Sequence, residues 1–537
     1  MLATFLALAV AQSSPTLFFE PTFDPTTVAV ADRLRSPTDI AAIPGDDRIF
    51  VTQQDAKIRI IRDGELLQQP FADLAFQIPF DANGGLLALT FHPSFDVNGF
   101  AYIWYADRDL NTQRRSTVLA RITVDSSDPD LADLTSLVEI LRVPVDSLIH
   151  LGGRMAFGPD GMLWIGIGDG GGAPVPGCSS QDMTRLAGKM IRIDVDAGFP
   201  YVVPPDNPFI GVPGVAPEIV HSGLRHPWKW TFDGATGDLW IGEIGSLYRE
   251  EVNFAPAGVF GLNYGWPAEE GSLCFDVSAC SASIPACGDS SYTAPAFEYP
   301  HGAFGDPEGE CAVTGGEVYY GSAVPWLVGW YLCADLCTNQ MWRIRRTPLG
   351  TFEVRELPVV FESPPSPGAW SSLSFGIDGF GELLFLDFAS FGMVRRLRGA
   401  CTAVTTCDGA PNAAGTAAEI RWGGSTSLEA NDALVIVTDL PASSPTLLFY
   451  GPLTDLIAVG NGSLCVGGPL SRVSVDVADG TGRSQFDLDF TAPPFSVGPG
   501  EIELGSTWTF QAWYRDIGGP LGSTYNFSGA TTVTFCP

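Results

Sequence analysis

The chain has 537 residues, with 61 acidic against 29 basic side chains and a formal net charge of −32. This charge repels phosphate backbones and anionic lipid, so it argues against a nucleic-acid partner and against binding to a membrane surface. The length indicates more than one domain, and 61 glycines, 42 prolines and 11% aromatic residues, without long runs of helical period, favour an all-β protein.

The N-terminal segment MLATFLALAVAQSSP is a short apolar run that ends in a small-x-small pattern. We predict a signal peptide over residues 1–11, and therefore an exported protein, secreted or periplasmic. No other run is long and apolar enough to span a bilayer, so no membrane span is expected.

The 11 cysteines fit an oxidising compartment. Their short spacings indicate local disulfides in loops rather than a zinc site, which would need tight pairs or nearby histidines. The odd number leaves at least one thiol unpaired. The local pairs are Cys274/Cys280, Cys333/Cys337 and Cys401/Cys407.

One pattern recurs along the chain from residue 40: an apolar strand, a turn with Pro, Asp or Gly, and a second apolar strand. Such a unit is a β-hairpin. Six hairpin units that cannot bury both faces alone predict a six-bladed β-propeller over residues 15–399. The copies begin at Ile40, Leu89, Met155, Trp230, Gly315 and Leu373.

The third copy contains LWIGIGDGGGAPVPG, in which Gly166, Gly168 and Gly171 have the spacing of a dinucleotide-binding turn. That turn requires a helix directly after the third glycine, and the Pro-Val-Pro-Gly that follows prevents one. Since Trp164, Gly166 and Gly168 share one face of a strand, the glycines instead predict close approach of a backbone or ligand to an innermost strand.

His150 lies just before the first strand of this hairpin, and Asp169 ends the second. The turn at residues 159–161 places both at the same end, where a carboxylate can fix the tautomer of an imidazole and raise its basicity, as a general base requires. A structural histidine that caps a blade is the alternative. Arg225 and His226 hold the same position in the next hairpin, where Arg225 either holds a carboxylate or quinone oxygen or forms a salt bridge between blades.

The segment GEIGSLYREEVN places Glu243, Glu250 and Glu251 around the backbone carbonyls of Gly245 and Ser246. Such an oxygen-rich turn suits Ca²⁺, and a solvated acidic turn is the alternative. The sequence contains no Gly-x-Ser-x-Gly, His-Glu-x-x-His or Gly-Lys-Ser/Thr motif.

The composition changes after Gly399. Residues 400–419 are rich in small side chains and predict a linker, and residues 420–537 contain short alternating runs that predict a β-sandwich-like domain. A disulfide between Cys465 and Cys536 is one way to close this domain. It contains no histidine, and adhesion, glycan binding and sorting all remain open roles for it.

Several segments together resemble the glucose/sorbosone dehydrogenase family, the soluble aldose sugar dehydrogenases that use pyrroloquinoline quinone (PQQ). The resemblance extends from about residue 15 to residue 398, and the C-terminal part resembles a module of secreted planctomycete and myxobacterial proteins. The segments are GLLALTFHPSF, HLGGRMAFGPDGMLWIGIGDGG, GKMIRIDVD, GLRHPWKWTFDGATGDLWIGEIG and NYGWP.

The resemblance implies a six-bladed propeller with PQQ and Ca²⁺ at the mouth of its central channel. It also implies an exported bacterial enzyme that oxidises the C1 hydroxyl of an aldose to the lactone and passes electrons to an external acceptor. In that family His150 matches the general base, Asp169 its orienting carboxylate and Arg225 a quinone contact. His226 stands where an Asn is usual, and Asn83 stands where a Gln touches the cofactor.

The resemblance also implies two calcium sites. Gly245 and Ser246 match the carbonyls that bind the cofactor-side Ca²⁺, and Glu251 and Tyr264 match a second, structural site.

The last blade departs from the sugar dehydrogenases. They carry two arginines just before its first strand to neutralise the carboxylates of PQQ, whereas this chain has Ala369, Trp370 and Ser371. Burying carboxylates without counter-charges is unfavourable, so this departure weakens the prediction of PQQ. The family also includes non-catalytic propellers such as the hedgehog-interacting proteins. The alternative function is therefore a non-catalytic, calcium-stabilised secreted propeller that binds a protein or glycan partner.

Overall fold

The structure of the chain, a computed structural model, describes residues 26–78, 84–109, 112–171, 178–275, 277, 280, 284–302, 310–321, 323–361, 370–388, 392–398, 403–423, 426, 428, 431–503 and 505–535. The predicted signal peptide and Asn83 lie outside these residues. Strands dominate, and the helical segments described are α1 (Phe95–Asn98) and the 3-10 turn η1 (Pro325–Leu327). Neither has the length of a membrane-spanning helix.

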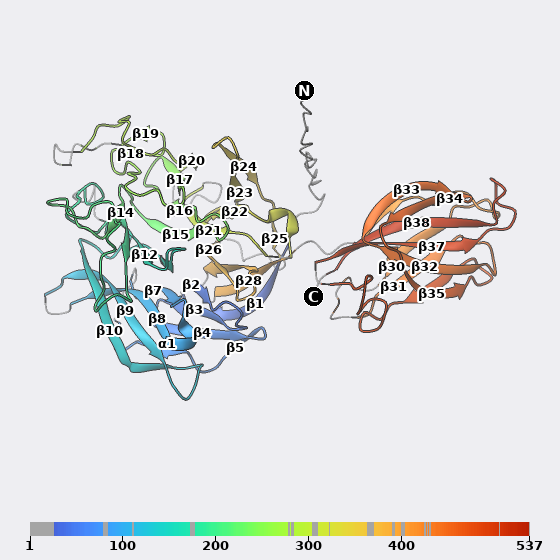
Figure 1. Ribbon diagram of the computed structural model, residues 1–537, viewed down its shortest axis with the longest axis horizontal. Coiled ribbons are helices and arrows are strands. Elements are labelled where there is room, and N and C mark those ends of the chain that lie inside the picture. The colour runs from blue at the N-terminus through green and yellow to red at the C-terminus, as the bar shows by residue number, and fades with distance from the viewer. Residues whose placement is uncertain are drawn as a thin grey trace, which may run out of the picture.

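The described residues between 26 and 398 form six sheets of four or five strands around a central axis (Figure 1). In each sheet the strands are named from the innermost outward. The first sheet contains β2 (Pro37–Ala42), β3 (Ile49–Gln53), β4 (Lys57–Arg62) and β5 (Glu65–Leu66), with β6 (Ala72–Asp73) also paired to β4. The second sheet contains β7 (Leu86–Phe91), β8 (Phe100–Arg108), β9 (Arg115–Val124) and β10 (Ala132–Val145), and the third contains β11 (Arg154–Phe157), β12 (Leu163–Ile167), β13 (Lys189–Ile193) and β14 (Ile219–His221).

The other three sheets complete the circle. They are β15 (Pro227–Phe232), β16 (Leu239–Glu243), β17 (Arg249–Ala255) and β20 (Phe297–Pro300); β21 (Val313–Val318), β22 (Tyr331–Asp335), β23 (Met341–Arg346) and β24 (Phe352–Glu356); and β26 (Trp370–Ile377), β27 (Leu383–Phe388), β28 (Gly392–Arg398), β1 (Thr26–Leu34) and β25 (Val360–Phe361). A small separate ribbon pairs β18 (Glu269–Glu270) with β19 (Leu273–Cys274).

The innermost strands β2, β7, β11, β15, β21 and β26 contact one another in this order, and β26 contacts β2, so the ring is closed. The N-terminal strand β1 pairs antiparallel with β28 and thereby joins the last sheet. This arrangement is a β-propeller. We call the end of its central channel where the innermost strands begin the upper mouth, and the end where they finish the lower mouth.

The core of the propeller lies between neighbouring sheets. Strands β3, β12, β16 and β22 are buried along their whole length, because each packs against other blades on both faces. Phe50, Phe71 and Phe91, for example, form edge-to-face ring contacts between the first two sheets. The faces of the blades therefore supply the burial that a single hairpin lacks.

The C-terminal unit has a sheet of five strands and a sheet of three that enclose one hydrophobic core, in which Tyr450 stacks on Phe510. This is the predicted β-sandwich-like arrangement. The first sheet is β29 (Ala403–Cys407), β38 (Tyr525–Thr534), β37 (Thr507–Arg515), β32 (Pro445–Gly451) and β35 (Ser471–Val477), the second is β30 (Glu419–Gly423), β31 (Leu434–Thr438) and β36 (Ser484–Asp487), and β33 (Leu453–Val459) pairs with β34 (Gly462–Gly467).

The predicted linker at residues 400–419 is partly structured. Strand β29 pairs with β38 and so belongs to the C-terminal sheet. Its Thr and Val residues favour a strand, and the small residues around it hid this preference in the sequence.

The predicted disulfides are wrong. Cys333 is a free thiol inside β22, buried in the core, so it does not reach the turn residue Cys337. Cys465 pairs with Cys407, which excludes a bond to Cys536. The disulfides among the described residues are Cys178–Cys280, Cys274–Cys287, Cys311–Cys337 and Cys407–Cys465.

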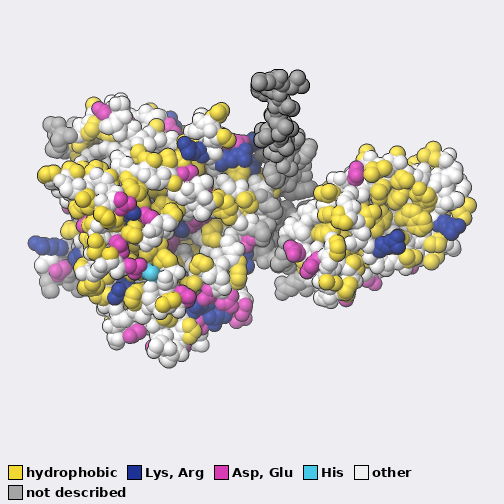
Figure 2. Space-filling view, in the orientation of Figure 1, with side chains coloured by type: hydrophobic (Ala, Val, Ile, Leu, Met, Phe, Trp, Pro, Cys, Tyr) yellow, Lys and Arg dark blue, Asp and Glu magenta, His cyan; other side chains and the backbone are white. Residues whose placement is uncertain are grey.

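The acidic side chains do not gather in one patch on the face shown in Figure 2, where they are interspersed with basic and apolar groups. This distribution is typical of a solvated acidic surface rather than of a site for a basic partner.

Candidate active site

The upper mouth carries the predicted dyad. Strand β11 pairs with β12 so that Arg154 faces Gly166, which brings the segments before β11 and after β12 together. There His150 Nδ1 lies 2.9 Å from Asp169 Oδ1. The expectation that the hairpin turn brings these two side chains to one end is confirmed.

Asp169 is a buried acceptor for three N–H groups. Besides His150, the backbone N–H of Gly171 donates to Oδ1 at 2.8 Å, and Trp266 Nε1 donates to Oδ2 at 3.1 Å. Because a carboxylate partner makes Nδ1 of His150 the donor, Nε2 carries the lone pair. The His150 side chain is 20% exposed and that of Asp169 only 1%, so the ring borders the mouth while its partner is enclosed.

The close approach predicted from the glycines is found here, but the prediction that they lie on an innermost strand is wrong, because β12 is the second strand of its sheet and β11 is innermost. A Cβ on Gly168 would lie 1.9 Å from the carbonyl oxygen of His150 and 3.1 Å from that of Arg225. The backbone N–H of Asp169 donates to that same Arg225 carbonyl at 2.7 Å. His150 itself has a φ of 51°, an uncommon conformation for a residue other than glycine, and such strain is often found at functional sites.

Arg225 and His226 lie beside the dyad, as expected. Glu243 Oε1 accepts both of their backbone N–H groups, at 2.5 and 2.7 Å, and this fixes the start of β15. Arg225 Nη1 donates to the carbonyl of Ile244 at 2.9 Å, and its guanidinium lies 5.6 Å from the ring centre of Trp266. Among the described residues, the Arg225 guanidinium is thus held by neutral groups and by no carboxylate.

His226 is a neutral neighbour of the general-base candidate. Its ring centre lies 5.5 Å from that of His150. Burial, with His150, Arg225 and Lys229 nearby, holds the pKa of His226 well below its usual range. Its Nδ1 is buried and has no hydrogen-bond partner among the described residues.

The acidic turn after β16 is organised by two buried carboxylates. Glu270 Oε1 accepts N–H groups from Ser246, from Leu247 at 2.8 Å and from Tyr248 at 3.1 Å. Glu250 Oε2 accepts the N–H of Gly245 at 3.2 Å. Among the described residues, no hydrogen bond ends on the carbonyl oxygen of Gly245 or Ser246.

Several buried oxygens near this turn lack partners. Glu243 Oε2 and Glu270 Oε2 have none among the described residues. Burial and the nearby Glu251 raise the pKa of Glu243 well above its usual range, although the backbone N–H groups of His226 and Arg225 and the charge of Arg225 oppose this shift. Such a set suits an oxygen-liganded cation. Within the described ranges, however, no three His, Cys, Asp or Glu side chains are grouped to hold a metal, so Ca²⁺ here would depend on backbone carbonyls.

Glu251 and Tyr264 have different partners among the described residues. Glu251 accepts hydrogen bonds from the N–H of Gly271 and from Asn253 Nδ2, and burial raises its pKa to about 8. Tyr264 packs 5.9 Å from the ring of His221 in a separate hydrophobic cluster, and its buried hydroxyl has no partner among the described residues. No hydrogen bond joins the two side chains within the described part of the chain, and a shared calcium site stays a prediction.

Sequence reasoning missed Trp266 and Glu270 as residues that build the upper mouth, whereas it named Glu243 as part of the acidic turn. Trp266 lies in NYGWP, a segment noted for its family resemblance without a role for the indole. Glu270 lies outside the acidic turn in the sequence, and its bonds to the backbone N–H groups of that turn leave no sequence signal. In the last blade, Ala369 and the side chains of Trp370 and Ser371 lie outside what the structure describes.

The fold and the upper mouth define a class of protein: a β-propeller that holds an imidazole, a carboxylate and a guanidinium at one end of its channel. The sequence profile of Glucose / Sorbosone dehydrogenase matches residues 34–356, more than half of the chain. The chain therefore belongs to the glucose/sorbosone dehydrogenase family, as its motifs predict.

Curated relatives include enzymes and other proteins. The HIPL2 protein of Arabidopsis thaliana is 30% identical over 366 residues, 58% of this chain and 52% of that protein. Aldose sugar dehydrogenase YliI of Escherichia coli is 28% identical over 249 residues, 45% of this chain and 62% of that protein. Human Hedgehog-interacting protein is 28% identical over 207 residues, 36% of this chain and 30% of that protein. The alignments with the two HIPL proteins each span about half of the relative's length.

Solved structures share the fold. The soluble aldose sugar dehydrogenase of Escherichia coli in its apo form matches with a TM-score of 0.57 and 21% identity, over 70% of this chain and 99% of that chain. The PQQ-bound aldose sugar dehydrogenase of Streptomyces coelicolor matches with a TM-score of 0.50 and 21% identity, over 71% and 100%. The predicted all-β propeller class is confirmed.

Proposed function

We propose that the chain is an exported bacterial enzyme that oxidises the C1 hydroxyl of an aldose to the lactone at the upper mouth, with PQQ and Ca²⁺ and an external electron acceptor. The observation that carries this proposal is the 2.9 Å bond between His150 and Asp169 beside Arg225. Family membership and the dehydrogenase relative support it.

The residues of the upper mouth fit such a cofactor and its cation. His226 Nδ1, Glu243 Oε2 and Glu270 Oε2 are buried polar atoms without partners among the described residues, and buried polar atoms are normally satisfied. The Arg225 guanidinium would contact the quinone, and the carbonyls of Gly245 and Ser246 would bind Ca²⁺. When bound, PQQ supplies a two-electron acceptor for hydride.

The protein's own part in the reaction is proton transfer. His150 Nε2 accepts the proton of the substrate hydroxyl, because Nδ1 is occupied by Asp169. Asp169 then faces an imidazolium and stabilises its charge, and the Trp266 indole holds the carboxylate in place. His226 stays neutral beside it, so it adds no repulsion when His150 becomes charged.

The test is to add PQQ and Ca²⁺ to the purified protein and to follow dye reduction with a panel of aldoses. We expect turnover that is lost in His150→Ala and kept in Val97→Ala, an exposed residue of α1 near the lower mouth. PQQ uptake without turnover would mean a catalytically inactive relative of the enzymes. No uptake would contradict the proposal.

A second candidate is a non-catalytic, calcium-stabilised propeller that binds a protein or glycan. The sequence at residues 369–371, which lacks the arginine pair of the sugar enzymes, favours it, as does the similarity to Hedgehog-interacting protein. The absence of PQQ uptake together with stabilisation by Ca²⁺ would support this candidate instead.

A further inference from the structure

Buried ion pairs close the central channel between its two mouths. Lys229 Nζ donates to Asp39 Oδ1 at 2.7 Å, and Arg154 pairs with Glu317. Thr231 Oγ1 donates to Glu317 Oε2 at 2.5 Å. We call these five residues the channel plug. Its two cations are balanced by two carboxylates.

The channel plug ties all six innermost strands together. Asp39 Oδ2, on β2, accepts the N–H of Leu89 on β7 at 3.4 Å. Arg154 Nη1, on β11, donates to the carbonyl of Phe375 on β26 at 3.2 Å. The remaining two strands, β15 and β21, carry Lys229 and Glu317. A ligand at the lower mouth is therefore separated from the dyad at the upper mouth.

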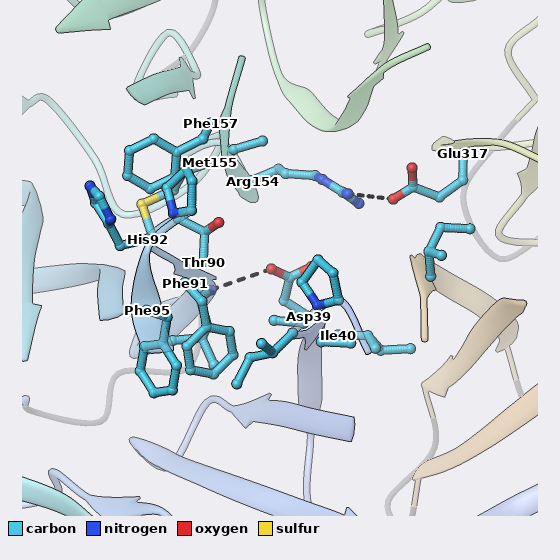
Figure 3. A pocket seen from close by; sticks show the side chains of 18 of the residues that line it. Asp39, Ile40, Thr90, Phe91, His92, Phe95, Arg154, Met155, Phe157 and Glu317 are labelled. Atoms are coloured by element: carbon cyan, nitrogen blue, oxygen red, sulfur yellow. Dashed lines mark hydrogen bonds and ion pairs between the residues drawn. The ribbon is translucent and has the colours of Figure 1, made fainter. Parts of the chain in front are cut away.

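On the other side of the plug lies a cavity of about 680 Å³, formed where the innermost strands end. We call it the lower basin. Figure 3 shows Arg154 extending toward Glu317 at its floor, with Thr90 nearby. The volume lies within the range of small-molecule sites in proteins.

The walls of the lower basin combine three phenylalanine rings with aliphatic side chains. Phe91 and Phe95 contact each other with ring centres 4.8 Å apart, and Phe157 closes another side (Figure 3). The faces and edges of these rings offer apolar contact to C–H groups of a ligand.

His92, also in the wall, has no nitrogen to spare. Its Nδ1 accepts from the N–H of Ser94 at 3.0 Å and from Asn98 Nδ2 at 2.8 Å, so Nε2 is the donor to Asp196 Oδ2 at 3.1 Å. With the imidazole fully engaged, it is not a general base. The described lining residues thus fit binding and not a reaction.

The ion pairs of the channel plug favour a neutral ligand over a charged one. A charged ligand would find the ions at the floor already engaged and would lose hydration there without compensation, while Asp96, a further lining carboxylate, is exposed and keeps its hydration. A hydroxyl group, in contrast, carries no charge and accepts a hydrogen bond from a guanidinium, so it suits Arg154, whose side chain is 16% exposed. Hydroxyl groups on a ring with apolar C–H faces also suit the walls.

We propose that the lower basin is a second binding site, for a neutral carbohydrate of one or two rings, on the opposite side of the channel plug from the dyad. This site does not rest on the proposed dehydrogenase function.

The first experiment is calorimetric titration of the full chain with four sugars. Glucose, glucuronate and glucosamine share one ring type and differ in charge, and maltose is a neutral probe with two rings. We expect glucose or maltose to bind with a dissociation constant of about 1 mM or tighter, and at least tenfold more tightly than the charged sugars. Preference for glucuronate or glucosamine, or no saccharide binding, would overturn the proposal.

Variants locate the binding. Phe95→Ala removes a half-buried ring of the wall, and Thr90→Val removes a hydroxyl at nearly constant shape; each should weaken maltose binding about fivefold or more. Val97→Ala, on the same helix as Phe95 and exposed, is the matched control and should bind like the natural chain. His150→Ala should also bind normally. Loss of binding only in His150→Ala would place the sugar at the upper mouth and refute the proposal.

A charge variant tests the reason for neutrality. Glu317→Gln keeps the shape of the floor but leaves Arg154 without its carboxylate. We expect glucuronate binding to strengthen about tenfold relative to maltose. An unchanged preference in a folded Glu317→Gln protein would show that the ion pair does not select the ligand.

Discussion

The two mouths of the channel differ in how their charges are satisfied. At the upper mouth Arg225 is held by a carbonyl and an indole, and Glu243 keeps an oxygen without a partner among the described residues. Towards the lower mouth, Arg154 and Lys229 each have a carboxylate. Unsatisfied polar groups and strained backbone are features of reaction sites, whereas balanced ions are features of structure and of neutral recognition. The same ring of strands therefore supports two kinds of site.

The difference also follows from the chain segments involved. His150 lies in a loop before β11 and has a left-handed backbone, and its position depends on Gly168. Arg154 and Lys229 lie inside strands β11 and β15, where the ladder fixes the backbone. The loop can be reshaped by few substitutions, and the strands cannot.

The largest expected effect lies at the upper mouth. His150→Ala should lower turnover with PQQ and Ca²⁺ by about 10²- to 10⁴-fold, because it removes the proton acceptor. Asp169→Asn keeps the shape of the side chain but removes the negative charge beside His150, so it should also lower turnover. Steady-state dye reduction measures both. Equal activity of His150→Ala and the natural chain would remove the contrast between the two mouths.

The next largest effect is expected on stability, from breaking an ion pair of the channel plug. Lys229→Met leaves Asp39 buried without its cation and should lower the free energy of unfolding by about 3–5 kcal/mol. Burial already lowers the pKa of Lys229, to about 8, with Asp39 opposing this shift. The double variant Asp39→Asn/Lys229→Met should recover part of the loss. Urea unfolding measures all three proteins, and a stable single variant would mean that the pair is not needed for the fold.

Loss of the indole N–H of Trp266 is expected to lower turnover less than loss of His150 does. Trp266→Phe keeps the ring but removes the N–H that bonds to Asp169 Oδ2, and should lower turnover about tenfold while the fold is retained. Trp104→Phe, which loses an indole bond to the carbonyl of Leu151, is a control for the loss of a buried indole hydrogen bond. Similar turnover in both variants would contradict a positioning role for Trp266.

The acid sensitivity of the upper mouth should come partly from His226. Its pKa in the folded chain lies well below its usual value near 6.5, so the unfolded chain binds the proton more readily. The stability that this residue contributes is present above about pH 6.5 and falls as the pH decreases below it. His226→Asn should flatten the pH dependence of thermal unfolding in this window. An identical pH profile would show that His226 is not the group involved.

Much of the propeller could be predicted from the sequence, because hairpins signal themselves locally through alternating residues and Asp-Gly turns. The dyad was predictable for the same reason, since one short turn determines that His150 and Asp169 meet. The contact of Trp266 with Asp169 could not be predicted, because the two residues lie 97 positions apart in the sequence. Contacts between segments far apart in sequence carry no local pattern.

The disulfides illustrate the same limit. Cys178 and Cys280 are 102 residues apart and meet because two long loops lie together, whereas the nearby Cys274 pairs with Cys287. Spacing along the chain favoured the wrong partners. The channel plug was also missed, because its four charged residues lie in four strands, β2, β11, β15 and β21, that come together only when the ring closes.

The pairing of β1 with β28 has a consequence for how the chain is made. A strand that begins at Thr26 must remain without its partner until Arg398 has been synthesised, so the ring closes only after nearly all of the propeller exists. Until then β1 exposes an unpaired edge, which favours aggregation. Folding of this protein should therefore be slow, and a holdase chaperone acting on the nascent chain should raise its yield.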